Sequence, residues 1–170
     1  MTARDAILGA IRAAAVPPAA AAAALTAPAA TEGSPNMHEE FLRVLGTVGG
    51  RGVVRRADQS LDQVLAALLG DDRDGAVIVR GRFAVAENAA VYVDAADLEA
   101  RTQVVLPEHL VLVVPFDAMV PTMHEAVRLM PATSACGWFL SGPSKTADIE
   151  QALVVGAQGS RTLRVIFDVA

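Results

Sequence analysis

The sequence has few of the residues that build covalently linked or metal-bound sites. Its 170 residues include a single cysteine, Cys136, so no disulfide can form within the chain. The histidines His38, His109 and His124 lie too far apart in the sequence to form a local metal motif. We therefore predict that this chain itself holds no metal, no iron–sulfur cluster and no other cofactor.

Basic residues are also in the minority. The 14 Lys and Arg against 19 Asp and Glu give a formal net charge of −5. Such a chain is not drawn to nucleic-acid phosphates or to anionic lipid, so we predict neither nucleic acid nor a membrane as a partner. Hydrophobic residues make up 53% of the chain and charged ones only 19%, which is enough apolar material for the core of one compact domain.

The N-terminal region is rich in alanine and interrupted by proline. A secretory signal needs a basic start and a leucine-rich core, and Asp5 and the prolines break that pattern, so we predict a cytoplasmic protein. Residues 1–15 nevertheless predict an amphipathic helix, because Ile7, Leu8 and Ile11 recur on one helical face.

Residues 16–36 consist mainly of Ala and Pro and cannot build a packed core, so they predict a tether. We expect the N-terminal helix to dock on its own chain or on a neighbouring subunit. In the second case the arm would join copies of the chain into a homo-oligomer.

The rest of the chain, residues 37–170, alternates between two hydrophobic patterns. Helical spacing predicts helices over 37–50, 60–70, 120–130 and 146–155. Short apolar runs predict strands over 52–57, 75–81, 89–95, 102–107, 109–116, 137–141 and 162–169. Helices that interleave with continuous apolar strands indicate an α/β protein with a largely parallel, Rossmann-like sheet flanked by helices. Consecutive strands in the middle of the chain predict a hairpin or an antiparallel edge.

The stretch "SGPSKT" at residues 141–146 is the strongest candidate for a ligand site. It follows the end of a predicted strand and precedes a predicted helix, a place where α/β proteins bind ligands. Hydroxyls, free amides at a helix start and an ammonium all favour an anion there, a small carboxylate or a phosphorylated ligand. The residues involved are Ser141, Gly142, Ser144, Lys145, Thr146.

A structural interpretation of the same stretch stays open. Ser144 or Thr146 can simply cap the predicted helix. The stretch also lacks the glycine that precedes the lysine of a phosphate-binding loop, which excludes nucleotide hydrolysis.

Three further residues are candidates, each with a structural alternative. Glu87 could act as a base or nucleophile, or it could be a solvated turn residue. His109 could contact a substrate or transfer a proton, or it could bond to backbone. Arg161 could bind an anion through two hydrogen bonds, or it could be a surface arginine at the start of a strand.

Four segments resemble the LUD-domain family of lactate utilization proteins (LutC/YkgG). The most specific is "SGPSKTADIEQALVVGAQGSRTLRVI", which is similar to the family pattern S-G-P-S-[RK]-T-A-D-I-E followed by G-x-x-G-x-R. "RFAVAENAAVYVD" and "VVLPEHLVLVV" resemble its A-E-T-G-T-V and L-P-P-x-H-V-x-V-V segments, and "ARDAILGAIRAA" resembles its N-terminal helix. Two departures stand out: Asn88 and Ala89 replace Thr and Gly of the family pattern, and the segment before residue 75 is shorter than usual.

The resemblance implies a NagB/RpiA/CoA-transferase-like α/β fold over residues 37–170. It also implies one component of a system that oxidises L-lactate to pyruvate together with iron–sulfur partner proteins. Two other functions remain open at this point: a stand-alone enzyme of acyl/CoA or phosphosugar chemistry that uses Glu87, and a ligand-sensing or scaffold protein.

Overall fold

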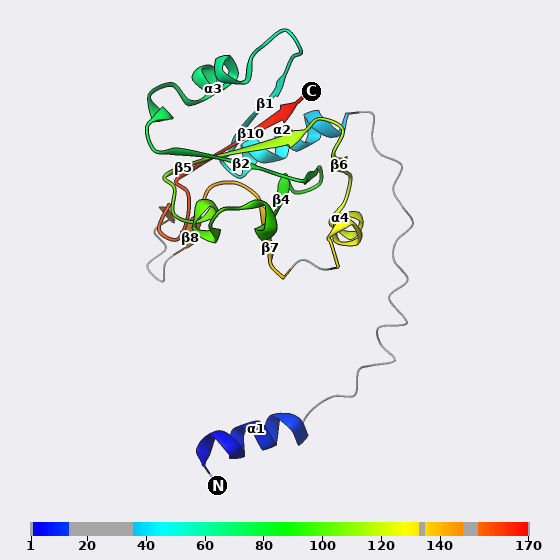
Figure 1. Ribbon diagram of the computed structural model, residues 1–170, viewed down its shortest axis with the longest axis vertical. Helices are drawn as coiled ribbons and strands as arrows, with labels where there is room; N and C mark the ends of the chain where they lie inside the picture. The colour runs from blue at the N-terminus through cyan, green and yellow to red at the C-terminus, as the bar shows by residue number, and fades with distance from the viewer. Residues whose placement is uncertain (1, 14–35, 133–134, 148–152, 170) are drawn as a thin grey trace.

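The structure, a computed structural model, describes residues 2–13, 36–132, 135–147 and 153–169 (Figure 1). The helices are α1 (Ala3–Ala13), α2 (Met37–Thr47), α3 (Leu61–Leu69) and α4 (Met123–Leu129). The strands are β1 (Arg51–Arg55), β2 (Ala76–Arg80), β3 (Phe83–Val85), β4 (Ala90–Asp94), β5 (His109–Pro115), β6 (Met119–Val120), β7 (Gly137–Leu140), β8 (Lys145–Ala147), β9 (Leu153–Val155) and β10 (Thr162–Asp168). Short 3₁₀ turns lie at Gly70–Arg73, Ala95–Asp97 and Arg101–Val104.

The core of the protein is a four-stranded parallel sheet, here called sheet A, in the order β1-β10-β5-β2. Its two central strands, β5 and β10, pair over their full length from His109 opposite Thr162 to Pro115 opposite Asp168. Both are almost continuously apolar, which is typical of strands covered on both faces. The parallel register brings the first residues of all four strands to one edge.

The two faces of sheet A are covered differently. On one face, Leu112 of β5 and Val165 of β10 pack with Phe41 and Leu45 of α2, and all four side chains are fully buried. On the other face, Val111 and Ile166 pack against α3. Because neighbouring residues of a strand point to opposite faces, the alternation along β5 and β10 sorts their side chains between these two layers.

A second, mixed sheet, sheet B, lies in the order β6-β3-β4-β7. Strands β3 and β4 form an antiparallel hairpin, and β7 pairs antiparallel with β4. One face of sheet B joins the core under sheet A through Val91 and Val93. Its other face packs Tyr92 against Phe83, Phe139 and Ala126 of α4.

Most of the predicted elements are confirmed. The N-terminal helix is present as α1, and the predicted helices over 37–50, 60–70 and 120–130 correspond to α2, α3 and α4. The predicted hairpin in the middle of the chain is β3–β4. The predicted parallel sheet is sheet A. The prediction had helices alone on both of its faces, whereas sheet B covers part of one face. The predicted tether falls almost entirely outside the described residues.

Two predicted elements are wrong. The predicted strand over 102–107 is instead a 3₁₀ turn, in which the Gln103 side chain accepts hydrogen bonds from the amides of Glu99 and Ala100. The predicted helix over 146–155 is wrong at both of its ends, where Lys145–Ala147 and Leu153–Val155 are antiparallel strands β8 and β9; residues 148–152 lie outside the described residues.

Candidate functional site

A polar pocket of about 250 Å³ opens at the amino ends of β1 and β10. The turn after α2, the 3₁₀ turn after α3 and the first residues of β10 form its wall. The lining residues are Gly49, Arg51, Asp72, Thr162, Leu163 and Arg164. Three segments that are distant in the sequence meet here because parallel strands begin at the same edge of sheet A.

Arg164 is the buried centre of this site, with only 5% of the residue exposed. Its Nε donates to the carbonyl of Leu68 at 2.9 Å, and its two terminal nitrogens donate to Thr162 Oγ1 and Asp72 Oδ2, each at 2.5 Å. The Leu68 carbonyl lies in the last turn of α3, where it has no partner within the helix. The guanidinium therefore also caps α3 and complements its dipole.

His109 completes the network from the neighbouring strand. The residue is 6% exposed, its ring Nδ1 lies 2.9 Å from Thr162 Oγ1, and its Nε2 lies 3.8 Å from Asp72 Oδ1. A guanidinium can only donate, so Thr162 Oγ1 accepts from Arg164 and is able to give its own proton to Nδ1.

Asp72 is the acidic member of the network. The hydrogen bond from Arg164 holds the pKa of Asp72 below its ordinary value, and the charges of His109, Arg164 and Arg161 act in the same direction against the opposing effect of burial. Asp72 is therefore ionised at neutral pH, and its charge is already matched by Arg164.

Two further cations lie at or beside the pocket. Arg51 lines the pocket, and no carboxylate among the described residues pairs with it. Lys145, which is the single lysine of the chain, packs its side chain over Gly49: a Cβ added at Gly49 would lie 3.2 Å from Lys145 Nζ. Gly49 has a φ of +85°, so the turn both needs glycine and leaves space for the ammonium.

The turn before Lys145 is held by contacts within the protein. The Ser141 hydroxyl donates to the carbonyl of Asn88 at 2.5 Å, and Gly142 (φ +80°) packs closely on Val48. The amide of Ser144 donates to the carbonyl of Ser160 at 2.9 Å, and its carbonyl accepts from the amide of Gly156 at 2.9 Å. Thr146 lies in β8, opposite Val154.

Two of the features that predicted an anion at this turn differ in the structure. The amides of a helix start are not available, because β8 follows the turn instead of a helix. Moreover, β7 belongs to the mixed sheet B, so the rule for ligand sites at the carboxyl ends of parallel strands does not apply to it. Of this stretch, Lys145 is the residue whose side chain lies against Gly49, which belongs to the pocket wall.

Arg161 and Glu87 lie outside the pocket wall. Arg161 forms a largely exposed ion pair with Glu108, with 2.5 Å between Nη1 and Oε1. The Glu87 carboxylate accepts a hydrogen bond of 2.7 Å from the amide of Met123, the first residue of α4. Of the predicted residues, the structure thus brings Lys145 and His109 to the pocket region, with Arg161 near its rim.

Replacing Glu87 by alanine should lower the free energy of unfolding by about 1 kcal/mol, because an amide at the start of α4 loses its carboxylate partner. Urea unfolding followed by circular dichroism measures the change. Glu99→Ala, which removes an exposed carboxylate that pairs with no side chain among the described residues, serves as the matched control and should change stability by less than about 0.5 kcal/mol. Equal effects of the two variants would contradict the capping role.

Arg51, Asp72 and Arg164 were not predicted as site residues. Asp72 lies in the stretch that precedes β2, where spacing alone shows no partner. Arg164 did leave a signal, because it is a charged residue inside the apolar run of β10, at a position that faces α3. Among the described residues no three His, Cys, Asp or Glu side chains cluster closely enough to hold a metal ion.

Sheet, helices and pocket together define an α/β domain with a cationic pocket at the amino edge of a parallel sheet. Residues 75–167, more than half of the chain, match the LUD domain, and the chain belongs to that family. None of the helices in the described ranges is long and apolar enough to cross a membrane.

The chain is similar to several proteins named lactate utilization protein C. It is 38% identical over 92 residues to lactate utilization protein C 1 of Bacillus mycoides, which covers 49% of this chain and 39% of that protein. It is 35% identical over 99 residues to lactate utilization protein C of Deinococcus radiodurans, covering 56% of this chain and 47% of that protein. The matched regions thus span less than half the length of these relatives.

A solved structure shares the fold. The crystal structure of a DUF162 family protein from Deinococcus radiodurans at 1.70 Å resolution superimposes with a TM-score of 0.61, covering 81% of this chain and 99% of that one. The two sequences are 18% identical, so this likeness concerns the fold alone.

Proposed function

We propose that this chain is a component of a lactate-utilization system, working with iron–sulfur partner proteins that carry the electrons from L-lactate as it becomes pyruvate. We also propose that its fold is of the NagB/RpiA/CoA-transferase type, and that it binds a small carboxylate or phosphorylated anion. Its membership of the LUD family and its similarity to proteins named lactate utilization protein C support the first part.

The charge balance of the pocket supports the anion site. Among the described residues, Arg51 and Arg164 line the pocket and Lys145 lies beside it, against one lining carboxylate, Asp72, which Arg164 already binds. Arg51 and Lys145 are both exposed. A guanidinium can bind a carboxylate or phosphate through two parallel hydrogen bonds, and an ammonium adds a point charge. These two residues would hold the anion, with the Thr162–His109 pair beside it.

In this proposal the 141–144 turn positions Lys145 and does not itself bind the ligand. The hydroxyl of Ser141 and the backbone of Ser144 are engaged within the protein, and Gly142 allows the close approach to Val48. The turn is therefore anchored on both sides, which fixes where β8 begins and where the Lys145 side chain starts.

Because Lys145 is the single lysine, an amine-reactive reagent modifies one side chain apart from the chain terminus. We expect L-lactate, pyruvate, phosphate or coenzyme A to slow modification of Lys145 several-fold, measured by mass spectrometry of the digested protein. Arg51→Ala should remove this protection. Arg56→Ala, an exposed arginine that pairs with Asp58 away from the pocket, is the matched control and should keep it.

If none of the four ligands protects Lys145 in the wild-type protein, the anion-site part of the proposal is wrong. Protection that survives Arg51→Ala would also contradict it, because in this proposal Arg51 binds the anion together with Lys145. The partner part is tested separately: the chain isolated from its native cells should carry proteins with the visible absorbance of iron–sulfur clusters, and isolation without them under native conditions argues against it.

A further inference from the structure

The face of sheet A that carries α3 is only partly covered. Four strands about 4.8 Å apart make a sheet wider than a single helix, which is about 10 Å across. Beside α3, over β2 and β5, lies a groove of about 320 Å³. The groove residues are Leu61, Ile78, Arg80, Val113, Pro115 and Asp168. Ile78, in the middle of β2, is 48% exposed.

That exposure does not fit the sequence of β2. The run "AVIV" at 76–79 is typical of a strand covered on both faces. Val79, which faces the core, is only 3% exposed, whereas its neighbour Ile78 faces the groove. The pattern of β2 thus indicates a layer over the groove that α3 alone does not supply.

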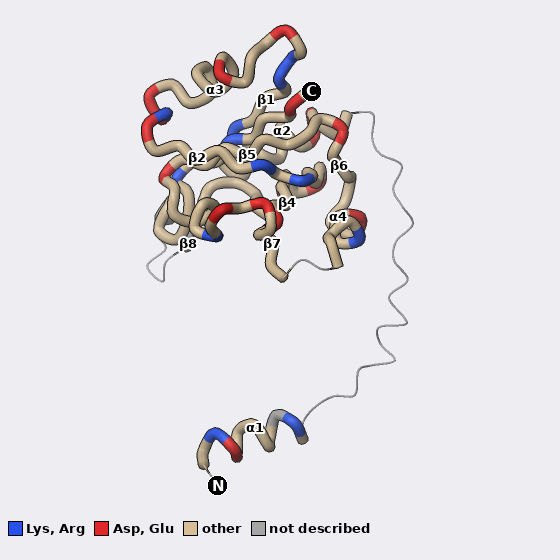
Figure 2. Tube along the Cα trace, in the orientation of Figure 1, with Lys and Arg blue, Asp and Glu red and all other residues tan. Residues whose placement is uncertain are grey.

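Helix α1 has an exposed apolar side that could cover such a groove. It stands apart from the body in Figure 1, its apolar residue Ile7 is 61% exposed, and its charged residues lie toward its two ends with an uncharged stretch between them (Figure 2). A helix of 11 residues with Gly9 at its centre is marginal in water on its own. Its helical form therefore needs a surface on which the apolar face can pack.

The connection between α1 and α2 is long enough for α1 to reach the groove. Residues 14–36 connect α1 to α2, and 23 residues can extend over about 75 Å, whereas a domain of this size has a radius of gyration of about 14 Å. At the start of α2, His38 stacks on Phe116 with 4.0 Å between ring centroids. Phe116 directly follows Pro115, which lies in the groove wall.

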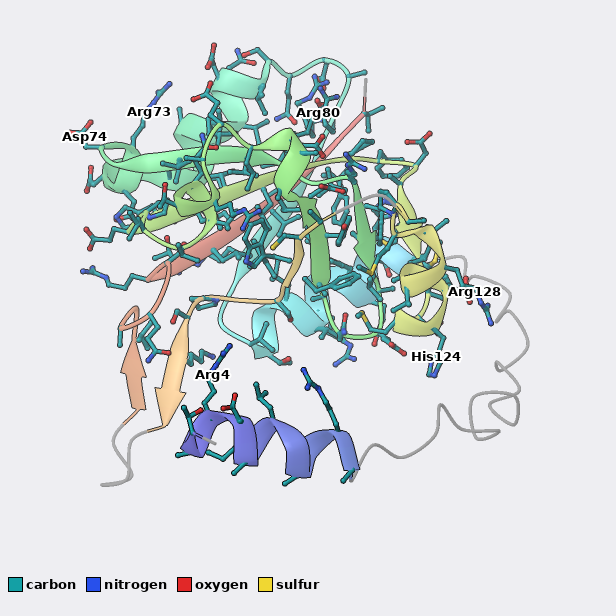
Figure 3. The ribbon with its side chains drawn as sticks, turned by 60° about the horizontal axis from the view of Figure 1, so that its bottom comes forward. Arg4, Arg73, Asp74, Arg80, His124 and Arg128 are labelled. Carbon is teal, nitrogen blue, oxygen red and sulfur yellow. The ribbon has the colours of Figure 1, made fainter. Side chains whose placement is uncertain are left out.

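We propose that α1 docks in this groove of its own chain, as a second helix beside α3, with Ile7 and Leu8 against Ile78 and Val113. Figure 3 shows Arg4 of α1 and Arg80 of the groove wall on opposite sides of the body, so the docked form is a second arrangement reached through the connecting segment. A helix tethered in this way meets the groove at an effective concentration in the millimolar range. Arg80, which pairs with no carboxylate among the described residues, adds a cation for Asp5.

Paramagnetic relaxation tests this arrangement in the full chain. A nitroxide is attached at Ala6→Cys, on the face of α1 away from Ile7, in a Cys136→Ser background. The labelled ¹⁵N chain is diluted into an excess of unlabelled chain, so that only contacts within one chain give a signal. We expect the amides of β2 and of the start of α3 to lose most of their intensity.

Ile7→Glu should restore that intensity, and Ile78→Thr, which keeps the β-branched shape, should restore most of it. Gly9→Gln is the matched control: a Cβ at Gly9 meets nothing within 4 Å, and the change favours the helix, so the intensity loss should persist. Lys145→Ala should also leave docking unchanged, because the groove is separate from the pocket.

Three results would overturn the proposal. Unchanged intensities on β2 and α3 would mean that α1 does not dock there. Losses centred on another apolar surface, such as Val127 and Leu129 of α4, would mean that it docks elsewhere. In a third experiment, one chain carries the nitroxide but no ¹⁵N, and it is mixed with a second chain that carries ¹⁵N but no nitroxide. Intensity losses that appear only in this mixture would mean that the groove binds α1 of a second copy.

Discussion

Replacing Arg164 by leucine should lower the free energy of unfolding by about 3 kcal/mol, although leucine is the more hydrophobic residue. Arg164 is 5% exposed, and its guanidinium satisfies the Leu68 carbonyl and Thr162 Oγ1 in addition to Asp72. Leucine leaves the carbonyl at the end of α3 without a donor and fills the space of the guanidinium only in part. Urea unfolding followed by circular dichroism measures the loss.

Arg161→Leu is the matched control, because Arg161 lies three residues away, is 62% exposed and pairs only with exposed Glu108 among the described residues. This variant should cost between 0 and about 1 kcal/mol. If both variants lose a similar free energy of unfolding, burial of the Arg164 network does not determine how much this network stabilises the fold.

The Arg164 effect should also depend on pH. Arg164 holds the pKa of Asp72 below its ordinary value, so this ionised pair stabilises the fold above that value, near pH 4, and the contribution is lost as the pH falls through the lower pKa of the folded state. In Arg164→Leu the main cause of the lowered pKa is gone. The stability difference between wild type and variant should therefore narrow below about pH 4, and a constant difference would argue against an ionised Asp72 as partner.

The elements that the sequence predicts well are those with local signals. Helix α3 follows directly from Ser60, whose side chain accepts from the amide of Gln63 while the Gln63 side chain accepts from the amide of Ser60. Strands β5 and β10 follow from long apolar runs. In each case the residues that specify the element lie within it or at its ends.

The predicted helix over 146–155 failed because tertiary contacts outweigh local propensity there. The backbone of Ser144 pairs with Gly156 and Ser160, which fixes the two ends of the segment side by side. An α-helix over 146–155 would separate its ends by about 15 Å. The pairing of Lys145 with Val155 is instead that of an antiparallel hairpin.

The pocket was beyond sequence reasoning for a related reason. Arg51, Asp72 and Arg164 come from three segments, and their proximity depends on the strand order β1-β10-β5-β2, which no local pattern contains. His109 was predicted either to act on a substrate or to bond to backbone, and its observed hydrogen-bond partner is the Thr162 side chain. Its role in catalysis stays a prediction.

One departure from the family pattern acquires a physical meaning in the structure. The resemblance placed a glycine of the family at position 89, where this chain has alanine. Ala89 has a φ of +52° and is fully buried, and among the described residues it is the one non-glycine residue with positive φ. Left-handed backbone costs an L-residue roughly 1–2 kcal/mol, so the Cβ packing in the core partly offsets a strain that glycine would avoid.

Gly52→Val should lower the free energy of unfolding by about 3 kcal/mol, because helix α2 packs directly on the backbone of β1 at this position. A Cβ at Gly52 would lie 2.6 Å from Leu42 Cδ2 and 3.1 Å from both Leu45 Cδ2 and the carbonyl oxygen of Val165. Leu42 can move aside, but the carbonyl belongs to the β10 backbone beside β1 and cannot. Valine adds two methyl groups to this contact, so α2 has to shift away from the sheet and loosen the burial of Leu45.

Gly46→Ala is the control for the same helix, and it should act in the opposite direction. Gly46 is exposed in α2, and a Cβ there meets nothing within 4 Å, so alanine should raise stability by about 0.5 kcal/mol through helix propensity alone. Guanidinium unfolding of the two variants separates the causes. If Gly52→Val unfolds at the wild-type denaturant midpoint while Gly46→Ala moves it upward, then α2 does not rest on the β1 backbone, and the close packing inferred for this layer is wrong.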